Sequence, residues 1–222
     1  MLQELTDTSL EVGLKMNMSK TKVVSNEAPK IMKVHGETIQ HVQEYLYLGQ
    51  VVSFHARQDK EIAKRTENAW KSYWSMKDLF KGELPMALKQ KLMDMCILPV
   101  LTYGAQTWSL TNIQKSKLRV CQRAIESTSN EDRVRNTILR SKTKIVDVAQ
   151  KAAKLKWDWA GHVCRMPNKL WAKVAQSWCP ETARRGRDEL DRFHQNWQEE
   201  ARARERWKEW RKAFAQEWDR TG

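Results

Sequence analysis

The chain has 222 residues, of which 41% are apolar and 30% charged, and its formal net charge is +13. This length suits one large domain or two small ones, and the many charged residues with few glycines and prolines favour a mainly helical protein. The acidic N-terminal sequence and the lack of a long apolar run argue against a signal peptide and a membrane span. We therefore expect an intracellular protein, nuclear or cytoplasmic, that has no membrane partner.

The first 55 residues are expected to combine one helix with a small sheet. Leucines at helical spacing predict a helix over residues 1–14, and Gly13 lies where a helix often stops. Residues 45–54 form the strongest predicted strand, in which Gly49 indicates a bend, a bulge or a close approach of backbone. The remaining short strands and their hairpin turn are expected at residues 20–24, 30–34, 35–38 and 39–42.

Strand signals nearly vanish after Phe54, and helical spacing takes over. A stripe from Ile62 to Phe80 predicts a helix over residues 57–81. A second helix is expected to begin at Pro85 and to be interrupted at Pro99.

Three further helices are expected towards the C-terminus. The first covers residues 112–126 and directs Ile113, Leu118 and Cys121 to the core. The second covers residues 144–160. The tail from about residue 188 to 219 carries a stripe of Trp207, Trp210, Phe214 and Trp218. A polar stretch at residues 127–136 is the best linker candidate.

The positive charge is concentrated in the middle of the chain. Residues 111–180 carry a net charge of +10, against +2 before them and +1 after them. Such a block suits binding to a polyphosphate chain, although solvation of helix faces is the simpler alternative. The block comprises Arg119, Arg123, Arg133, Arg135, Arg140, Lys142, Lys144, Lys151, Lys154 and Lys156.

The order of segments resembles the C-terminal part of a non-LTR (LINE, RTE-like) retrotransposon endonuclease–reverse transcriptase. "VGLKMNMSKTKVV" is similar to polymerase motif D, with its lysine at Lys20. "EYLYLGQVVS" is similar to the primer-grip hairpin, on Tyr47, Leu48 and Gly49. The stretches "LPMALKQKLMDMCILPVLTYGAQTW" and "LKWDWAGHVCRM" resemble the thumb and the region beyond it.

The resemblance implies an α+β, mainly helical fold in three parts. Residues 1–55 would be a partial palm of one helix and a small antiparallel sheet. Residues 56–130 would be a thumb-like helical region, and residues 131–222 a basic, Trp-rich helical region. A motif D lysine lies near the incoming triphosphate in such polymerases, and a primer-grip glycine lets backbone approach a nucleic-acid strand. The simpler alternatives are a surface lysine at a strand start and an ordinary kinked strand.

The chain departs from the resembled family where the chemistry would occur. Such polymerases hold Mg²⁺ with aspartates that include an Asp-Asp pair, and this sequence has none. No complete catalytic site and no cofactor are therefore expected in this chain alone. A shortened junction at "STSN" and a "RRGRDEL" run without the family's proline and tryptophan indicate a decayed copy.

Other chemistry finds little support. His162, Cys164 and Cys179 lack the paired spacing of a zinc site, so no metal site is predicted. Most of the eleven tryptophans are expected to be buried, with Trp157 as the candidate for exposure and base stacking.

Two hypotheses for the function remain, beside a decayed transposon-derived protein without a selected role. The first is a polymerase remnant that binds RNA or DNA non-specifically, alone or with a missing upstream polymerase half. The second is a helical protein-interaction module.

Overall fold

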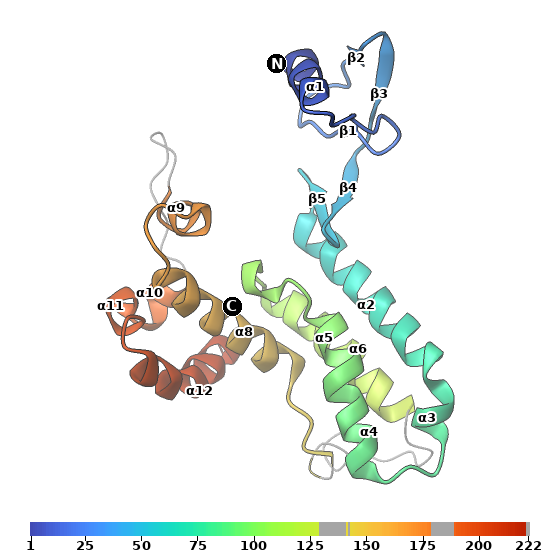
Figure 1. Ribbon diagram of the computed structural model, residues 1–222. Helices are drawn as coiled ribbons and strands as arrows, with labels where there is room; N and C mark the ends of the chain where they lie inside the picture. Colours follow the sequence, from blue (N-terminus) through green and yellow to red (C-terminus); the bar gives the residue numbers. More distant parts are fainter. Residues whose placement is uncertain (129–140, 142, 179–188, 221–222) are drawn as a thin grey trace. The chain divides into compact units, whose positions relative to one another are not determined.

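The computed structural model describes residues 1–128, 141, 143–178 and 189–220 (Figure 1). The chain forms two compact units, Met1–Glu61 and Ile62–Gly222, called here the N-terminal and C-terminal units. The predicted α+β, mainly helical fold is confirmed, since all strands of the described residues lie in the N-terminal unit and helices dominate elsewhere. The finer division at residues 55 and 130 stays a prediction.

The N-terminal unit begins with α1 (Leu2–Glu11), and Gly13 follows it with a φ of 78°, as the sequence predicts. A three-stranded sheet comes next, in the order β1-β3-β2. Strand β1 runs parallel to β3, and β2 pairs with β3 antiparallel through a turn at His35 and Gly36. The strands are β1 (Lys22–Val23), β2 (Met32–Val34) and β3 (Glu37–His41).

The single strand expected over residues 45–54 is wrong, because this stretch forms a tight hairpin. Strand β4 (Glu44–Tyr47) pairs antiparallel with β5 (Gln50–Ser53). Leu48 and Gly49 form the turn, with φ values of 48° and 78°. Positive φ at both turn residues gives a twist that matches paired strands, and glycine adopts it without strain. The hairpin form is the one that the primer-grip resemblance implies.

Helix α2 (Arg57–Ser75) carries the predicted apolar stripe, and Ala69, Tyr73 and Phe80 are buried. The predicted helix does not run unbroken to residue 81, because the chain leaves helical geometry at Met76 before α3 (Lys77–Lys81) begins.

Pro99 does not interrupt the next helix, contrary to expectation. Helix α4 (Met86–Leu92) begins directly after Pro85 and continues through a π-helical turn, η1 (Met93–Ile97), into α5 (Leu98–Leu101). Proline has no N–H to donate, and a wide π turn before it lets the helix continue despite that gap. A 3₁₀ turn, η2 (Ala105–Thr107), then follows Gly104, which has a φ of 78°.

The C-terminal half of the chain is helical in all its described elements. The predicted core residues Leu118 and Cys121 of α6 are buried, but Ile113 is 71% exposed because it lies on the outer side of the first turn. The helices are α6 (Asn112–Thr128), α8 (Val148–Cys164), α9 (Trp171–Ser177), α10 (Glu189–Phe193), α11 (Trp197–Glu200) and α12 (Arg204–Arg220).

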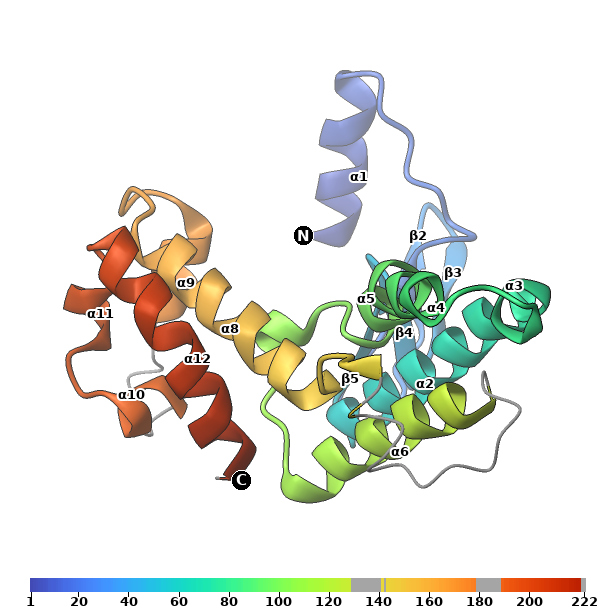
Figure 2. The same cartoon turned by 90° about the horizontal axis from the view of Figure 1, so that it is seen from below.

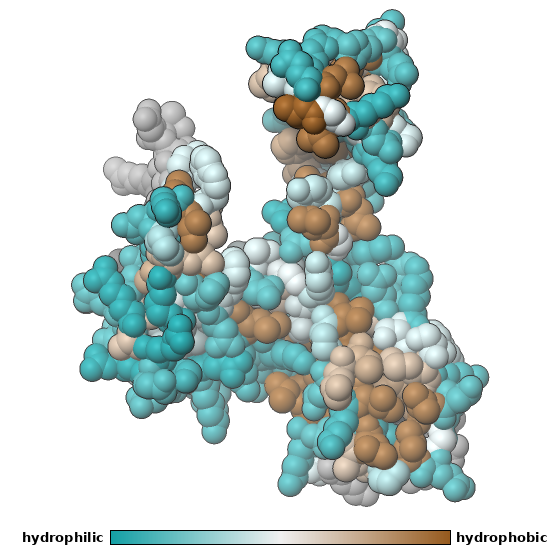
Figure 3. Space-filling view, in the orientation of Figure 1, coloured by the Kyte–Doolittle hydropathy of each residue, from teal (hydrophilic) through white to brown (hydrophobic). Residues whose placement is uncertain are grey.

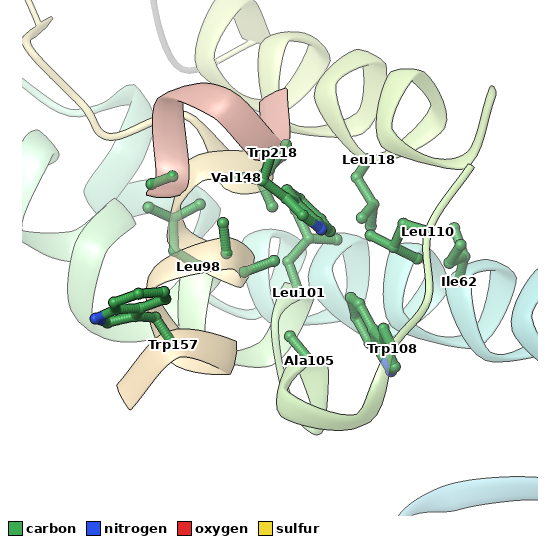
Figure 4. Packing of buried hydrophobic residues seen from close by; sticks show 14 of the residues in the cluster. Ile62, Leu98, Leu101, Ala105, Trp108, Leu110, Leu118, Val148, Trp157 and Trp218 are labelled. Carbon is green, nitrogen blue, oxygen red and sulfur yellow. The ribbon is translucent and has the colours of Figure 1, made fainter. Parts of the chain in front are cut away.

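One apolar cluster fills the C-terminal unit. It runs from Ile62 of α2 to Trp218 of α12, and α8 packs along α12 in both ribbon views (Figure 2). Side chains of α5 and η2 meet those of α6 and α8 in its centre (Figure 4). No described helix is both long and apolar enough to cross a membrane.

Trp157, the tryptophan singled out as the candidate for exposure, is wholly buried. Its indole ring stacks on that of Trp207, with 3.6 Å between ring centroids. Each indole N–H donates to the other residue's carbonyl, at 2.8 and 3.1 Å. Gly161 makes room for this pair, since a Cβ there would lie 2.2 Å from Nε1 of Trp207. The two tryptophans therefore join α8 to α12.

Candidate nucleic-acid interface

The ten basic residues predicted to bind nucleic acid differ in their surroundings. Four of them lie outside the described residues: Arg133, Arg135, Arg140 and Lys142. The other six belong to α6, α8 and the segment before α8.

Two of these six are occupied by contacts inside the C-terminal unit. Nζ of Lys151 donates to the carbonyl of Asp94 at 3.3 Å, and burial lowers the pKa of this lysine. Lys156 is paired with Glu189 and also donates to the carbonyl of Trp108 at 3.0 Å. Sequence counting could not separate these structural cations from available ones, because their partners lie far away in the chain.

The remaining four basic residues line one open depression of about 760 Å³. Arg119 and Arg123 come from α6, Lys144 from the segment before α8, and Lys154 from α8. Lys144 has a φ of 52° and is exposed. We call this surface the basic depression.

Two carboxylates that the sequence analysis missed also line the basic depression. Nε of Arg119 donates to both carboxylate oxygens of Asp147, at 3.2 and 3.3 Å, and Arg119 also pairs with Asp219. Asp147 caps α8 by accepting from the backbone N–H groups of Ala149 and Gln150. An aspartate directly before a helical stripe is a signal for such a cap.

The four cations of the basic depression therefore differ in whether a carboxylate neutralises them. Arg119 neutralises much of the carboxylate charge, while its side chain is only 18% exposed. Arg123, Lys144 and Lys154 have no acidic partner among the described residues. Cations held in one hollow without carboxylate partners suit contacts to phosphate oxygens.

Lys20 lies at a well-formed turn in the N-terminal unit. Asn17 organises this turn, because its side-chain oxygen accepts from the backbone N–H of Lys20 at 3.1 Å. Thr21 closes it by donating its hydroxyl to the carbonyl of Asn17 at 2.8 Å. The Asn-x-x-Lys-Thr pattern thus has a local structural reason, and the lysine side chain remains exposed.

The primer-grip residues share the N-terminal unit with Lys20. The hydroxyl of Tyr45 on β4 donates to the carbonyl of Lys20 at 3.3 Å, which joins the hairpin to the lysine turn. Tyr47 and Leu48 are 60% and 75% exposed. The buried carboxylate of Glu61 accepts from the backbone N–H of Val51 at 2.7 Å and fixes the base of the hairpin on α2.

The Mg²⁺ site that the resemblance implies for such polymerases has no counterpart among the described residues. The described residues contain no group of three or more His, Cys, Asp or Glu side chains placed to hold a metal ion. His162 and Cys164 lie on α8, and Cys179 is outside the described residues.

Comparison with known proteins identifies a relative of transposon origin. A Caenorhabditis elegans protein described as transposon-derived is 30% identical over 194 residues, which cover 81% of this chain and 70% of the worm protein. No family model and no solved structure matches the chain. Identity at this level over most of both chains shows that this protein belongs to a family of transposon-derived proteins.

Proposed function

We propose that this transposon-derived protein binds RNA or DNA through phosphates at the basic depression and does not catalyse polymerisation. The finer ancestry, the C-terminal part of a non-LTR retrotransposon reverse transcriptase, is supported by the motif D and primer-grip resemblances. The observation that carries the proposal is the gathering of Arg123, Lys144 and Lys154 in one open hollow.

The chemistry of this hollow predicts binding without sequence preference. Lysine and arginine contacts to phosphates carry no base information, and each one releases counterions. We expect dissociation constants of about 10⁻⁴–10⁻⁶ M that weaken steeply with salt. The sequence has no Asp-Asp pair to hold the metal ions of polymerisation, so we expect no primer extension by the purified chain with Mg²⁺ or Mn²⁺.

The test replaces Arg123, Lys144 and Lys154 together with glutamine and measures binding of a labelled primer–template duplex by fluorescence anisotropy. Each phosphate contact contributes about 0.9 to the slope of log affinity against log salt, so we expect the slope to fall by about 2–3. The affinity for all sequences should decrease alike.

A matched control removes the same charge elsewhere. Arg204, Lys208 and Lys212 lie on exposed positions of α12 and also comprise one arginine and two lysines. Their replacement with glutamine should leave the affinity and the salt slope nearly unchanged. An equal loss in both triple variants would show that overall charge, and not the depression, governs binding.

A second candidate function is protein interaction, and one observation favours it. The β4–β5 hairpin exposes apolar side chains that a solvated hairpin does not need, and apolar surface is visible on the N-terminal unit and over α3 and α4 (Figure 3). These residues are Leu46, Tyr47, Leu48 and Val52 of the hairpin and Phe54 directly after it.

The occupant of such a surface would be another part of a polymerase, supplied by an upstream half. Association with that half should survive high salt, since apolar contacts are not screened, whereas nucleic-acid binding should not. If the chain binds neither nucleic acid nor the upstream half, it is a decayed transposon-derived protein that has retained no role.

A further inference from the structure

A second hollow, of about 340 Å³, lies between α8 and α9 in the C-terminal unit. Small side chains leave this space open, and they come from both helices. The residues of the two helix walls are Lys156, Trp159, Ala160, Val163, Ala172 and Ala175. This volume is at the lower end of the range of about 300–1,000 Å³ for small-molecule sites, so it suits one or two rings.

Trp159 is an aromatic wall of this hollow with no evident role in the core. Its side chain is 41% exposed, whereas Trp157, two positions earlier, is wholly buried. A ring of His162 lies nearby, with 5.7 Å between the two ring centroids. Partly exposed aromatic rings beside a hollow are the usual surface on which nucleobases stack.

Among the described residues, the polar side chains of the hollow without an ion-pair partner are neutral amides. Gln106 of η2 and Gln176 of α9 line it, and neither side-chain amide bonds to another described residue. Lys156, the cation that the described residues contribute to the wall, is occupied by Glu189 and the Trp108 carbonyl. An amide offers both a donor and an acceptor, which matches the edge of a base better than a phosphate.

We propose that this hollow takes one unpaired nucleobase of a single strand, stacked on Trp159, with Gln106 and Gln176 at its edge. Lys154 lies five residues before Trp159 on α8, about 8 Å along the helix axis and about 140° around it, so the strand's phosphates would pass around α8 to reach the basic depression. This inference rests on the proposed function and adds a contact to the nucleobase, which the phosphate contacts do not involve.

The experiment compares two single strands of equal length and charge, oligothymidylate and its abasic analogue, by fluorescence anisotropy. The wild-type protein should bind the base-carrying strand more tightly. Trp159→Leu should lower the affinity for that strand about tenfold, the effect of losing one stacked base, and leave the abasic strand within about twofold. The matched control is Trp74→Leu, which removes a 52% exposed tryptophan outside the hollow.

A second variant tests the hollow without removing the aromatic ring. Ala172→Met on α9 fills the space with a good helix former, so it should reproduce the Trp159→Leu effect. Thymidine monophosphate serves as a further probe. If thymidine monophosphate displaces the strand at similar concentrations, the ligand of the hollow is a free nucleotide, and the proposal of a single strand is overturned.

The outcomes separate the two proposals. Binding of both strands by the wild type with no response to Trp159→Leu or Ala172→Met would overturn the base site and leave the phosphate site intact. Failure of the wild type to bind either strand would overturn the base site, and failure to bind the primer–template duplex as well would overturn both proposals.

Discussion

The two units of the chain use their apolar residues in different ways. The N-terminal unit buries three large apolar side chains, Val34, Ile39 and Val51, whereas the cluster of the C-terminal unit runs from Ile62 to Trp218. More large apolar residues of the N-terminal unit are exposed than buried. They include Leu5, Leu10, Val12, Leu14, Ile31, Met32, Leu46, Tyr47, Leu48, Val52 and Phe54.

The difference teaches that an apolar pattern forms a core only when a second layer faces it. In the N-terminal unit, two small sheets and one helix offer few surfaces that can face each other. In the C-terminal unit, each helix packs its apolar side against that of another helix. We therefore expect the N-terminal unit to open locally at a much lower free energy than the C-terminal unit.

The largest expected effect comes from the tryptophan pair that joins α8 to α12. Trp207→Ala removes a buried ring, its stack on Trp157 and the hydrogen bond that its indole N–H donates, and should lower the free energy of unfolding by about 3–5 kcal/mol. Urea denaturation followed by near-ultraviolet circular dichroism measures this loss.

Hydrogen exchange gives the control for the comparison of units. Amides of residues 22–53 should exchange at the same rate in Trp207→Ala as in the wild type, while those of α8 and α12 should exchange faster. Gly161→Ala should weaken the same contacts because its Cβ would overlap the Trp207 indole. Equal acceleration in both units would show that they unfold as one.

The next effect concerns the π turn in the C-terminal unit. Pro99 cannot donate to the carbonyl of Asp94, and Lys151 donates to it instead. Lys151→Met leaves this carbonyl without that donor and should cost about 1–3 kcal/mol in a thermal or urea melt.

The comparison variant for this prediction is Lys154→Met, three residues away on the same helix. It should change stability by no more than about 0.5 kcal/mol but weaken nucleic-acid binding. The prediction would be contradicted if Lys154→Met lowered stability and Lys151→Met weakened binding. In that case Lys154 would be the structural residue and Lys151 the binding residue.

A pH-dependent effect is expected from Lys115, which is fully buried against the ring and the carbonyl of Trp218. Burial lowers the pKa of Lys115 below 10.5, whereas the unfolded chain keeps the ordinary value. Between these values the unfolded chain binds more protons, so this lysine adds stability as the pH rises and loses it as the pH falls.

Lys115→Met isolates this contribution because methionine does not titrate. The wild type should gain stability relative to the variant as the pH rises from the lowered pKa of Lys115 towards 10.5, by at most about 1.4 kcal/mol per pH unit. Urea denaturation of both proteins at several pH values measures the difference. A difference that stays constant or falls with pH would contradict the lowered pKa.

The smallest effect is expected in the β4–β5 hairpin. Leu48 adopts a positive φ that asparagine tolerates better, so Leu48→Asn should stabilise the hairpin by about 0.5–1 kcal/mol. Slower hydrogen exchange of the β4 and β5 amides, without a change in α8, checks this. Faster exchange would show that the exposed leucine contributes more by packing than it costs in strain.

The sequence predicts helices well and their buried faces less well. On α8 two apolar stripes overlap, one through Leu155 and Trp159 and one through Ala153, Trp157 and Ala160. The second is buried because Gly161 and the small alanines leave space for Trp207. Spacing within one helix cannot reveal that choice, which depends on a ring 50 residues away.

The candidate site shows the same limit for charge. The basic block in the sequence includes Arg123, Lys144 and Lys154, which line the basic depression, but it includes Lys156 on equal terms. What sets Lys156 apart is Glu189, 33 residues later in the chain. A charge count gives the sign of a surface, whereas ion pairs that close over such distances decide which cations remain available.

The long separations also bear on how the protein is made. The partner of Trp157 is Trp207, 50 residues later in the chain, and that of Lys115 is Trp218, 103 residues later. On a ribosome, α6 and α8 emerge before α12 exists, so a buried lysine and a large indole stay uncovered during synthesis of the tail. Contacts of such separation slow folding and leave apolar surface open to aggregation meanwhile. Chaperone dependence during translation should therefore concentrate on α6 and α8.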